Sequence, residues 1–376
     1  MTPLAHLLRE TISRTGPIST ARFMAEALAH PEHGYYLARD PLGASGDFIT
    51  APEVSQMFGE LIGLWCVDCW MRLGMPEPFV FAELGPGRGT LMADALRAAR
   101  VKPAFLKALE LHLVETSPVL RRHQAETLAA WRPSWHDRID DLPARPMLLI
   151  ANEFFDALPI RQFERTTAGW RERLVGIDSR TDGFLFVLAD RPPEASVSLP
   201  DPAPIANGAI VEIAPLAEPI TEFIAAGIAE MRGAALIIDY GYAFEATERD
   251  TRRDARRDAG RDAWTGTLQA VRGHRTEHPL ADPGDVDITA HVDFAALRRF
   301  ARKAGAGVHG PIAQGLFLEA LGIKERAARL ARAAPQPVAA EIAMALHRLT
   351  APSAMGRLFQ ALAISHPALG TPSGFA

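Results

Sequence analysis

Cysteine, lysine and long apolar runs are all scarce in this chain of 376 residues. The two cysteines, Cys66 and Cys69, cannot build a disulfide framework, which agrees with a reducing compartment. No apolar run approaches the roughly 18 residues that a membrane-spanning helix needs. Residues 1–30 also lack the apolar core and the cleavage site of a secretory signal. We therefore predict a cytoplasmic protein without membrane insertion.

The chain has no excess of positive charge. It contains 40 basic and 45 acidic residues, and its formal net charge is −5. The chain as a whole is therefore not built to bind nucleic acid by neutralising phosphates. Apolar residues, in contrast, make up 48% of the sequence, so the chain can bury a large core. The length indicates about two domains, or one enlarged domain with insertions.

The first 75 residues are expected to form a helical extension and a loop. Apolar residues at helical spacing predict helices over residues 4–14 and 20–29. The first of these is amphipathic and carries arginine, as in a mitochondrial transit peptide, although Glu10 is atypical of one. Residues 30–52 show no period and indicate an ordered loop. A broad apolar face then predicts a buried helix that follows this loop.

From residue 76 onward, short apolar runs alternate with helical stretches. Helices are expected to begin near Thr90 and Ser117. Such alternation implies βαβ units and a parallel sheet. We therefore predict an α/β fold over residues 76–376, a Rossmann-like, doubly wound and mostly parallel sheet. The strands expected first are FVFAEL, LHLVE and MLLIAN, at residues 79–84, 111–115 and 147–152.

Two insertions are expected in this fold, at about residues 159–205 and 243–290. The first contains apolar runs separated by turn signals and is predicted to be an antiparallel meander. The second contains an Arg/Asp repeat at residues 249–262, which we interpret as a solvated surface segment, with contact to RNA or a partner as the alternative. Further helices are expected near residues 216–231, 293–304 and 322–350, and further strands at 235–242 and 357–364.

The strongest local signal is FAELGPGRGT at residues 81–90, where a strand ends in an acid, Glu83, and three glycines precede a helix. Glycines permit positive φ angles and let the backbone approach a ligand at the N-terminus of a helix. A dinucleotide fingerprint would need glycine where Thr90 stands, whereas this spacing is typical of S-adenosylmethionine sites. The alternative is a tight turn without a ligand. The three glycines are Gly85, Gly87 and Gly89.

Two further motifs follow predicted strands. Glu115 ends the second strand, where an acid can accept both ribose hydroxyls of an adenosyl ligand; the alternative is a solvated strand end. We expect Glu115 to lie at an exposed strand end. Asn152 and Glu153 end the third strand in ANEFFDALP and would lie beside a transferred group. Alternatively, Asp156 and the neighbouring phenylalanines only cap and pack the start of a helix.

Other reactive residue types are not expected to form sites. Cys66 and Cys69 lie in an amphipathic helix and are interpreted as buried packing. His30 and His33 flank a turn without a third ligand nearby, so we predict no metal site. Ser55 lacks the surroundings of a hydrolase nucleophile.

Taken together, these motifs resemble the MidA-like family of S-adenosylmethionine-dependent methyltransferases. The mitochondrial members of that family assist assembly of respiratory complex I by symmetrically dimethylating an arginine of one subunit. The resemblance extends from about Gly16 to Phe317, and the Arg/Asp repeat departs from it. The motifs are GYY (34–36), GDFITAPEVSQMFGELIGLW (46–65), ELGPGRGT (83–90), ANEFFDALP (151–159), IIDYGY (237–242), GTLQAVRGH (266–274) and DITAHVDF (287–294).

The resemblance implies a function, a cofactor and site residues. The expected activity is methylation of a protein arginine, with a subunit like those of respiratory NADH dehydrogenase as the substrate and S-adenosyl-L-homocysteine as the product. A eukaryotic member would lie in the mitochondrial matrix. A non-catalytic assembly factor that binds the cofactor is the alternative, and an NAD-dependent oxidoreductase is disfavoured by Thr90. The cofactor would contact Gly46, Asp47, Phe48, Thr50, Glu83, Gly85, Gly87, Gly89, Glu115 and Asn152, of which residues 46–50 would form a lid.

On the acceptor side, Glu153 is expected to orient the guanidinium group, because a cationic acceptor calls for a carboxylate. Asp47 and His291 are weaker candidates for accepting its proton. Further acceptor contacts that the resemblance suggests are Asn152, Asp239, Tyr240 and His274. For Asp239, Tyr240, His274 and His291 a core or capping role stays open.

Overall fold

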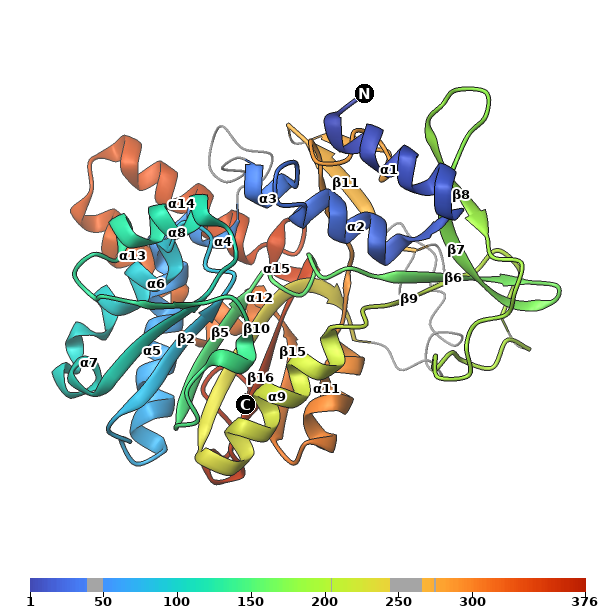
Figure 1. Cartoon of the computed structure of the whole chain (residues 1–376). Helices are drawn as coiled ribbons and strands as arrows, with labels where there is room; N and C mark the ends of the chain where they lie inside the picture. Colours follow the sequence, from blue (N-terminus) through green and yellow to red (C-terminus); the bar gives the residue numbers. More distant parts are fainter. Residues whose placement is uncertain (39–49, 204, 244–265, 274) are drawn as a thin grey trace. The chain divides into compact units, whose positions relative to one another are not determined.

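The computed structural model describes two compact units of the chain. We call them the small unit and the large unit, and Figure 1 shows their elements. The described residues are 1–38, 50–203, 205–243, 266–273 and 275–376. The small unit comprises Met1–Pro41, Ala157–Ala217 and Ala243–His291, and the large unit comprises Leu42–Asp156, Glu218–Tyr242 and Val292–Ala376.

This division differs from the predicted boundary near residue 75. Residues 1–41 group with the two insertions, whereas residues 42–75 group with the sheet. The physical reason is a set of contacts between distant segments. Thr2 Oγ1 donates to the Pro283 carbonyl at 2.7 Å, and the Tyr36 hydroxyl donates to Asp287 Oδ1 at 3.0 Å.

An eight-stranded sheet forms the centre of the large unit within the described residues. Its order is β15-β16-β10-β5-β2-β3-β4, with β14 beside β10. Strands β4, β3, β2, β5, β10 and β14 are parallel. Strand β16 runs antiparallel to both of its neighbours, β10 and β15, so β15 has the direction of the parallel strands. The strands are β2 (Phe79–Leu84), β3 (Leu109–Val114), β4 (Ser134–His136), β5 (Met147–Asn152), β10 (Gly233–Tyr242), β14 (Val292–Asp293), β15 (Gly307–Ala313) and β16 (Phe359–Ser365).

The mostly parallel α/β fold is therefore confirmed. The order of the strands also indicates where a ligand would be expected to bind. From β2 the chain proceeds to β3 and β4 on one side, and it then crosses to β5 on the other side of β2. In open parallel sheets, ligands bind at such a switch point, beyond the carboxyl ends of the strands. The glycine-rich turn follows β2 and Glu153 follows β5, so both border this point.

Helix α5 packs unusually close to α6. Ser55 caps α5, since its Oγ accepts from the Met57 N–H at 3.2 Å. A Cβ atom at Gly63 would lie 2.5 Å from the Cα atom of Ala95, and one at Gly59 would lie 2.7 Å from the Cβ atom of Asp94. Only glycine fits at these two positions, and the resulting core also contains side chains of β2.

Helix α11 contacts β10 and β15, α12 contacts β15 and β16, and α13 packs against α14. No helix in the described ranges is both long and apolar enough to cross a membrane. The helices are α4 (Ala51–Val54), α5 (Gln56–Arg72), α6 (Thr90–Ala98), α7 (Pro103–Ala108), α8 (Pro118–Thr127), α9 (Ala217–Met231), α11 (Phe294–Lys303), α12 (Gln314–Ala320), α13 (Ile323–Ala333), α14 (Gln336–Thr350) and α15 (Met355–Leu358).

The small unit contains the predicted meander. Strands β6, β7 and β8 pair antiparallel in sequence, and β1 and β9 extend their sheet. A separate three-stranded sheet has the order β12-β11-β13. The elements are α1 (Pro3–Thr15), β1 (Ile18–Ser19), α2 (Thr20–Ala29), α3 (Tyr35–Ala38), β6 (Arg161–Thr166), β7 (Gly169–Ile177), β8 (Phe184–Leu188), β9 (Ile210–Ile213), β11 (Gln269–Arg272), β12 (Arg275–Glu277) and β13 (Asp287–Thr289).

Candidate functional site

The glycine-rich turn joins β2 to α6 and has the backbone that its sequence predicts. Gly85, Gly87 and Gly89 have φ angles of 59°, 55° and 81°, a region that other residues rarely adopt. A Cβ atom at Gly85 would also lie 3.1 Å from the Phe154 ring, and one at Gly89 would lie 3.3 Å from Leu128. The turn therefore needs glycine both for its conformation and for the close approach of its neighbours.

Glu83 is a buried acid on β2. The residue is 3% exposed, and its Oε2 has no hydrogen-bond partner within the described part of the chain. Burial raises the pKa of Glu83 to about 8. An unsatisfied buried carboxyl is costly, which favours a site where a ligand supplies the missing donor.

Glu115 is not at the exposed strand end that we expected, because it is only 8% exposed. Its Oε1 accepts from the Ser117 N–H at 2.7 Å, and its Oε2 accepts from Gln124 Nε2 at 3.2 Å. Burial raises the pKa of Glu115, although these hydrogen bonds oppose the rise. The first turn of α8 and the side chain of Gln124 cover this carboxylate, so it is a buried acceptor rather than a solvated one.

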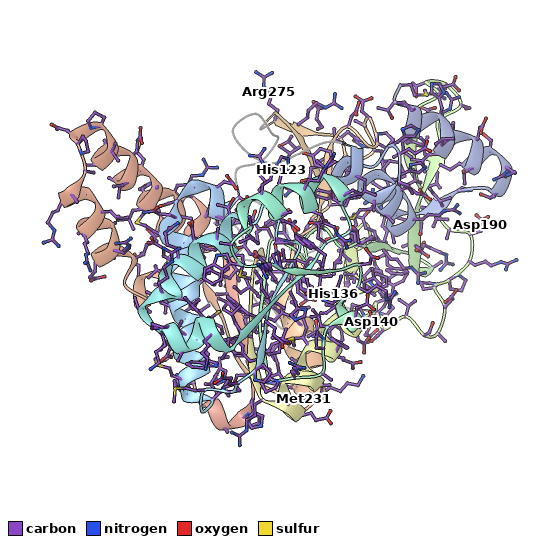
Figure 2. The ribbon with its side chains drawn as sticks, turned by 60° about the vertical axis from the view of Figure 1, so that its left-hand side comes forward. His123, His136, Asp140, Asp190, Met231 and Arg275 are labelled. Carbon is purple, nitrogen blue, oxygen red and sulfur yellow. The ribbon has the colours of Figure 1, made fainter. Side chains whose placement is uncertain are left out.

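Gln124 was missed by the sequence analysis. It lies on α8, is fully buried, and its Nε2 also donates to the Gly87 carbonyl at 2.7 Å. Its Oε1 accepts from the indole N–H of Trp135 on β4 at 2.8 Å. Figure 2 labels the adjacent residues His123 and His136, which mark this helix and this strand. One feature of the sequence could have indicated this role. Gln124 follows Leu120 by four positions, so this polar residue lies on the buried face of the helix.

Beyond β5, Glu153 has a strained backbone and a partly buried side chain. Its φ angle is 50°, which is rare for a residue with a Cβ atom. Its Oε1 accepts from the Ala51 N–H at 3.0 Å and from Asn152 Nδ2 at 3.2 Å. Desolvation raises the pKa of Glu153 to about 7; the charge of Asp156 adds to this rise and that of Arg348 opposes it. The Oδ1 of Asn152 is buried and has no hydrogen-bond partner among the described residues.

Asp239 holds the loop after β5. This residue is fully buried. Its Oδ2 accepts hydrogen bonds from the backbone N–H groups of Phe155 at 3.0 Å and of Asp156 at 3.2 Å. Its Oδ1 accepts from the N–H of Tyr240 at 2.9 Å. Burial raises its pKa well above the ordinary value, and the charges of Asp156 and Glu153 add to the rise. These contacts match the capping role that the sequence left open. No helix begins at Asp156, however, since the segment is a turn.

Helix α4 connects the two sides of the switch point. Its Ala51 N–H binds Glu153, and its Glu53 Oε1 accepts from the Thr90 hydroxyl at 2.6 Å. The threonine that distinguishes this turn from a dinucleotide fingerprint therefore has a structural partner. Thr50, a predicted lid residue, is the residue before α4 and caps it without a side-chain hydrogen bond.

The remaining predicted site residues stay predictions. Gly46, Asp47, Phe48 and His274 lie outside the described residues, as does the Arg/Asp repeat. His291 belongs to the small unit, where its N–H donates to Thr267 Oγ1 at 2.7 Å. The ring of Tyr240 packs against Phe359, with the ring centroids 5.4 Å apart.

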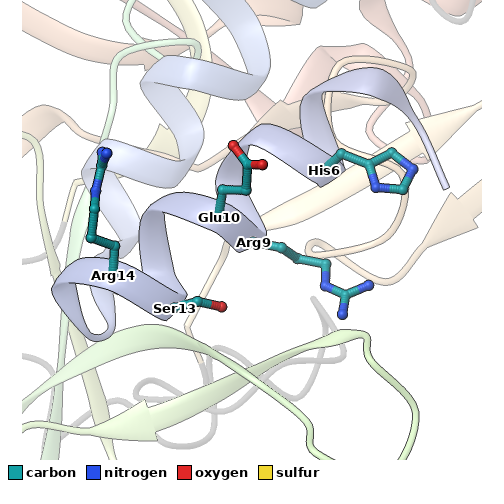
Figure 3. Close-up of a pocket in the computed structure, with 5 residues that line it drawn as sticks. All are labelled: His6, Arg9, Glu10, Ser13 and Arg14. Atoms are coloured by element: carbon teal, nitrogen blue, oxygen red, sulfur yellow. The ribbon is translucent and has the colours of Figure 1, made fainter.

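Two other kinds of site were considered in the described parts of the chain. No group of three or more His, Cys, Asp or Glu side chains there is arranged to hold a metal ion. Figure 3 shows an open hollow of about 530 Å³ along α1. It contains none of the predicted site residues; its lining is His6, Arg9, Glu10, Ser13 and Arg14.

Comparisons with known proteins identify the family of this chain. The family model described as "Putative S-adenosyl-L-methionine-dependent methyltransferase" matches residues 61–312. A Danio rerio protein named protein arginine methyltransferase NDUFAF7, mitochondrial, is 38% identical over 97% of this chain and 87% of its own length. The Homo sapiens protein of that name is 37% identical, over 97% of this chain and 83% of its own length.

A solved structure extends the likeness to the fold. The crystal structure of a Burkholderia thailandensis protein bound to S-adenosyl-homocysteine has a TM-score of 0.80 and 30% sequence identity. The match covers 99% of this chain and 93% of that one. The family model covers well over half of the chain, and together with these relatives it shows that the chain belongs to this family of S-adenosyl-L-methionine-dependent methyltransferases.

Proposed function

We propose that this chain methylates an arginine side chain of a protein. The observation that supports this most is the group of carboxyls beyond β5, of which Asp156 and Asp239 are buried and Glu153 is partly buried. The charge of Asp156 raises the pKa of Glu153, and the charges of Asp156 and Glu153 raise the pKa of Asp239. Such a group ionises fully only when a cation neutralises it, and guanidinium is a cation with a pKa above 12. The names of the relatives as protein arginine methyltransferases support the same acceptor.

The cofactor would bind at the β2 and β3 side of the switch point. The residues present fit it, because the buried oxygens of Glu83 and Asn152 without partners can accept hydrogen bonds from a polar ligand. The carboxylate of Glu115 would receive ribose hydroxyls, and Gly85, Gly87 and Gly89 would let the backbone approach the ligand. Gly46, Asp47, Phe48 and Thr50 would complete the site as its lid.

S-adenosylmethionine supplies an electrophilic methyl group on a positively charged sulfur. The protein therefore has to position the acceptor and control its charge. Glu153 is held by Ala51 and Asn152, so its carboxylate is oriented before the acceptor arrives. A guanidinium beside it would lower the pKa of Glu153 from about 7, keep the carboxylate charged, and allow it to receive the proton that the nitrogen loses. Asp47 and His291 remain candidates for the same proton.

The substrate we infer is a subunit of respiratory NADH dehydrogenase, as the resemblance to the MidA-like family implies. The compartment follows the source of the chain: cytoplasm in a bacterium and the mitochondrial matrix in a eukaryote. The names of the relatives include the word mitochondrial, which supports the second case only for eukaryotic members.

The test is transfer of labelled methyl groups. Purified protein would be incubated with labelled S-adenosylmethionine and the NADH dehydrogenase subunits of its own cell, and the modified residue would be identified by mass spectrometry. We expect label on arginine of one subunit. Label on lysine or on a carboxylate would overturn the arginine assignment. Tight cofactor binding without transfer to any subunit would instead favour the non-catalytic assembly factor.

A further inference from the structure

We propose that Gln124 is a positioning residue for cofactor binding. Its side chain joins the glycine-rich turn to Glu115, the acid that would accept the ribose hydroxyls. This inference rests on the proposed cofactor site. Three segments that are distant in sequence converge on one fully buried amide: the turn at Gly87, the strand end at Glu115 and the edge strand at Trp135.

The orientation of the amide follows from its partners. An indole N–H can only donate, so the atom of Gln124 that faces Trp135 must be the carbonyl Oε1. The NH₂ group therefore points the other way. Its two N–H bonds are directed to the Gly87 carbonyl at 2.7 Å and to Glu115 Oε2 at 3.2 Å, both of which are acceptors. A carboxylate or an apolar side chain at position 124 cannot make the same three contacts.

The close packing of α8 on the turn is the second observation. A Cβ atom at Gly89 would lie 3.7 Å from the Cα atom of Gln124 and 3.3 Å from Leu128. The backbone of α8 thus lies directly against the turn, and the amide of Gln124 spans a fixed gap. This arrangement holds the Gly87 peptide and the Glu115 carboxylate in one relative orientation before the ligand binds, which reduces the cost of ordering them.

The hydrogen bond from Gln124 still leaves Glu115 able to accept a hydrogen bond from the cofactor. Its Oε1 accepts from the Ser117 N–H and its Oε2 from Gln124 Nε2, and the Thr116 backbone also hydrogen-bonds this carboxylate. A carboxylate has about four acceptor positions, so these three contacts leave capacity for a ribose hydroxyl. Gln124 therefore orients the carboxylate without using up its capacity for the ligand.

The test is the substitution Gln124→Glu, with affinity for S-adenosylhomocysteine measured by calorimetry at pH 8 and at pH 5.5. At pH 8 the new carboxylate would face Glu115 and the Gly87 carbonyl, so we expect affinity at least about tenfold weaker than in the unmodified protein. At pH 5.5 one of the two acids would hold a proton and donate it, and most of the loss should be recovered. A merely structural role predicts a lower Tm with the same affinity ratio at both pH values.

A matched control lies in the small unit. Gln162 is 2% exposed and its Nε2 donates to Glu212 Oε1 at 2.8 Å, so Gln162→Glu places the same new charge beside a partly buried glutamate. Its effect on cofactor affinity should be negligible at both pH values. If Gln124→Glu does not fold, Trp135→Phe tests the same idea by removing only the indole donor, and a loss of about threefold is expected.

The outcomes separate this inference from the cofactor site itself. If Glu115→Ala keeps full affinity, the cofactor assignment fails. If Glu115→Ala loses affinity while Gln124→Glu matches the unmodified protein at pH 8, or is weakened equally at both pH values, only the role of Gln124 is overturned. Unchanged affinity in Trp135→Phe would also contradict it.

Discussion

The corner beyond β3 presents a buried glutamate and the corner beyond β5 a partly buried one, and the two are held in different ways. Glu115 accepts from the protein on both oxygens, and the charge of Arg121 lowers its pKa. Burial and the charge of Asp156 raise the pKa of Glu153 to about 7, although the charge of Arg348 opposes the rise. The first corner suits neutral donors such as hydroxyls, while the second, with its group of carboxyls, suits a cation. The difference supports our proposal that the cofactor binds beyond β3 and the acceptor beyond β5.

The comparison predicts its largest effect for Glu153→Gln. The amide keeps the shape of the side chain but removes the charge that recognises guanidinium. Methyl transfer should fall by about two orders of magnitude, the usual scale for one electrostatic contact in a transition state. Cofactor affinity, measured by calorimetry, should change little. Undiminished transfer would remove Glu153 from the mechanism.

Glu115→Ala should give the opposite pattern. Loss of hydrogen bonds from a carboxylate to a ligand costs about 2 to 3 kcal/mol, so affinity for S-adenosylhomocysteine should fall at least about 30-fold. Because Glu115 is buried, the Tm must be measured alongside to separate binding from folding. Wild-type affinity in a folded variant would contradict the proposal that the cofactor binds beyond β3 and the acceptor beyond β5.

Glu83 provides a smaller effect that depends on pH. The folded chain keeps this proton up to about pH 8, whereas the unfolded chain loses it near pH 4.5. The folded state binds more protons in this window, so stability falls as pH rises through it. The variant Glu83→Gln should lack the part of this loss of stability that Glu83 causes, which is on the order of a few kcal/mol. Urea unfolding at pH 5 and pH 9 measures this, and an equal decline in both proteins would refute the unpaired state of Glu83.

The smallest effect is expected for deletion of residues 249–262. A long surface insertion contributes little closure entropy, so the Tm and the cofactor affinity should stay nearly unchanged. Differential scanning calorimetry of the deletion variant checks this. A collapse of folding would show that the repeat packs against the rest of the chain.

The sequence predicted the elements of the large unit well because their signals are local. The first strand begins and ends as expected at residues 79–84, and the helix expected near Thr90 begins there. The burial of Glu115 could not be predicted, because it depends on Gln124 from the following helix. The contact between Glu53 and Thr90 likewise joins residues 37 positions apart.

The unpredicted strands show the same limit. Strand β4 has only three residues, and β15 contains glycine and proline, so neither shows an alternating apolar pattern. The partition of the chain was missed for a related reason. The contacts that join residues 1–41 to the insertions connect positions about 250 to 280 apart, and no local pattern reports them.

Helix α4 has a consequence for the order of events in a catalytic cycle. One turn of chain touches Thr90 at the cofactor side and Glu153 at the acceptor side. If α4 shifts when either ligand binds, the affinity for the other must change, and linkage requires the two changes to be equal in free energy. Such a shift would couple the two proposed half-sites through four residues, and a preferred order of cofactor before acceptor would then be a property of this short helix rather than of the sheet.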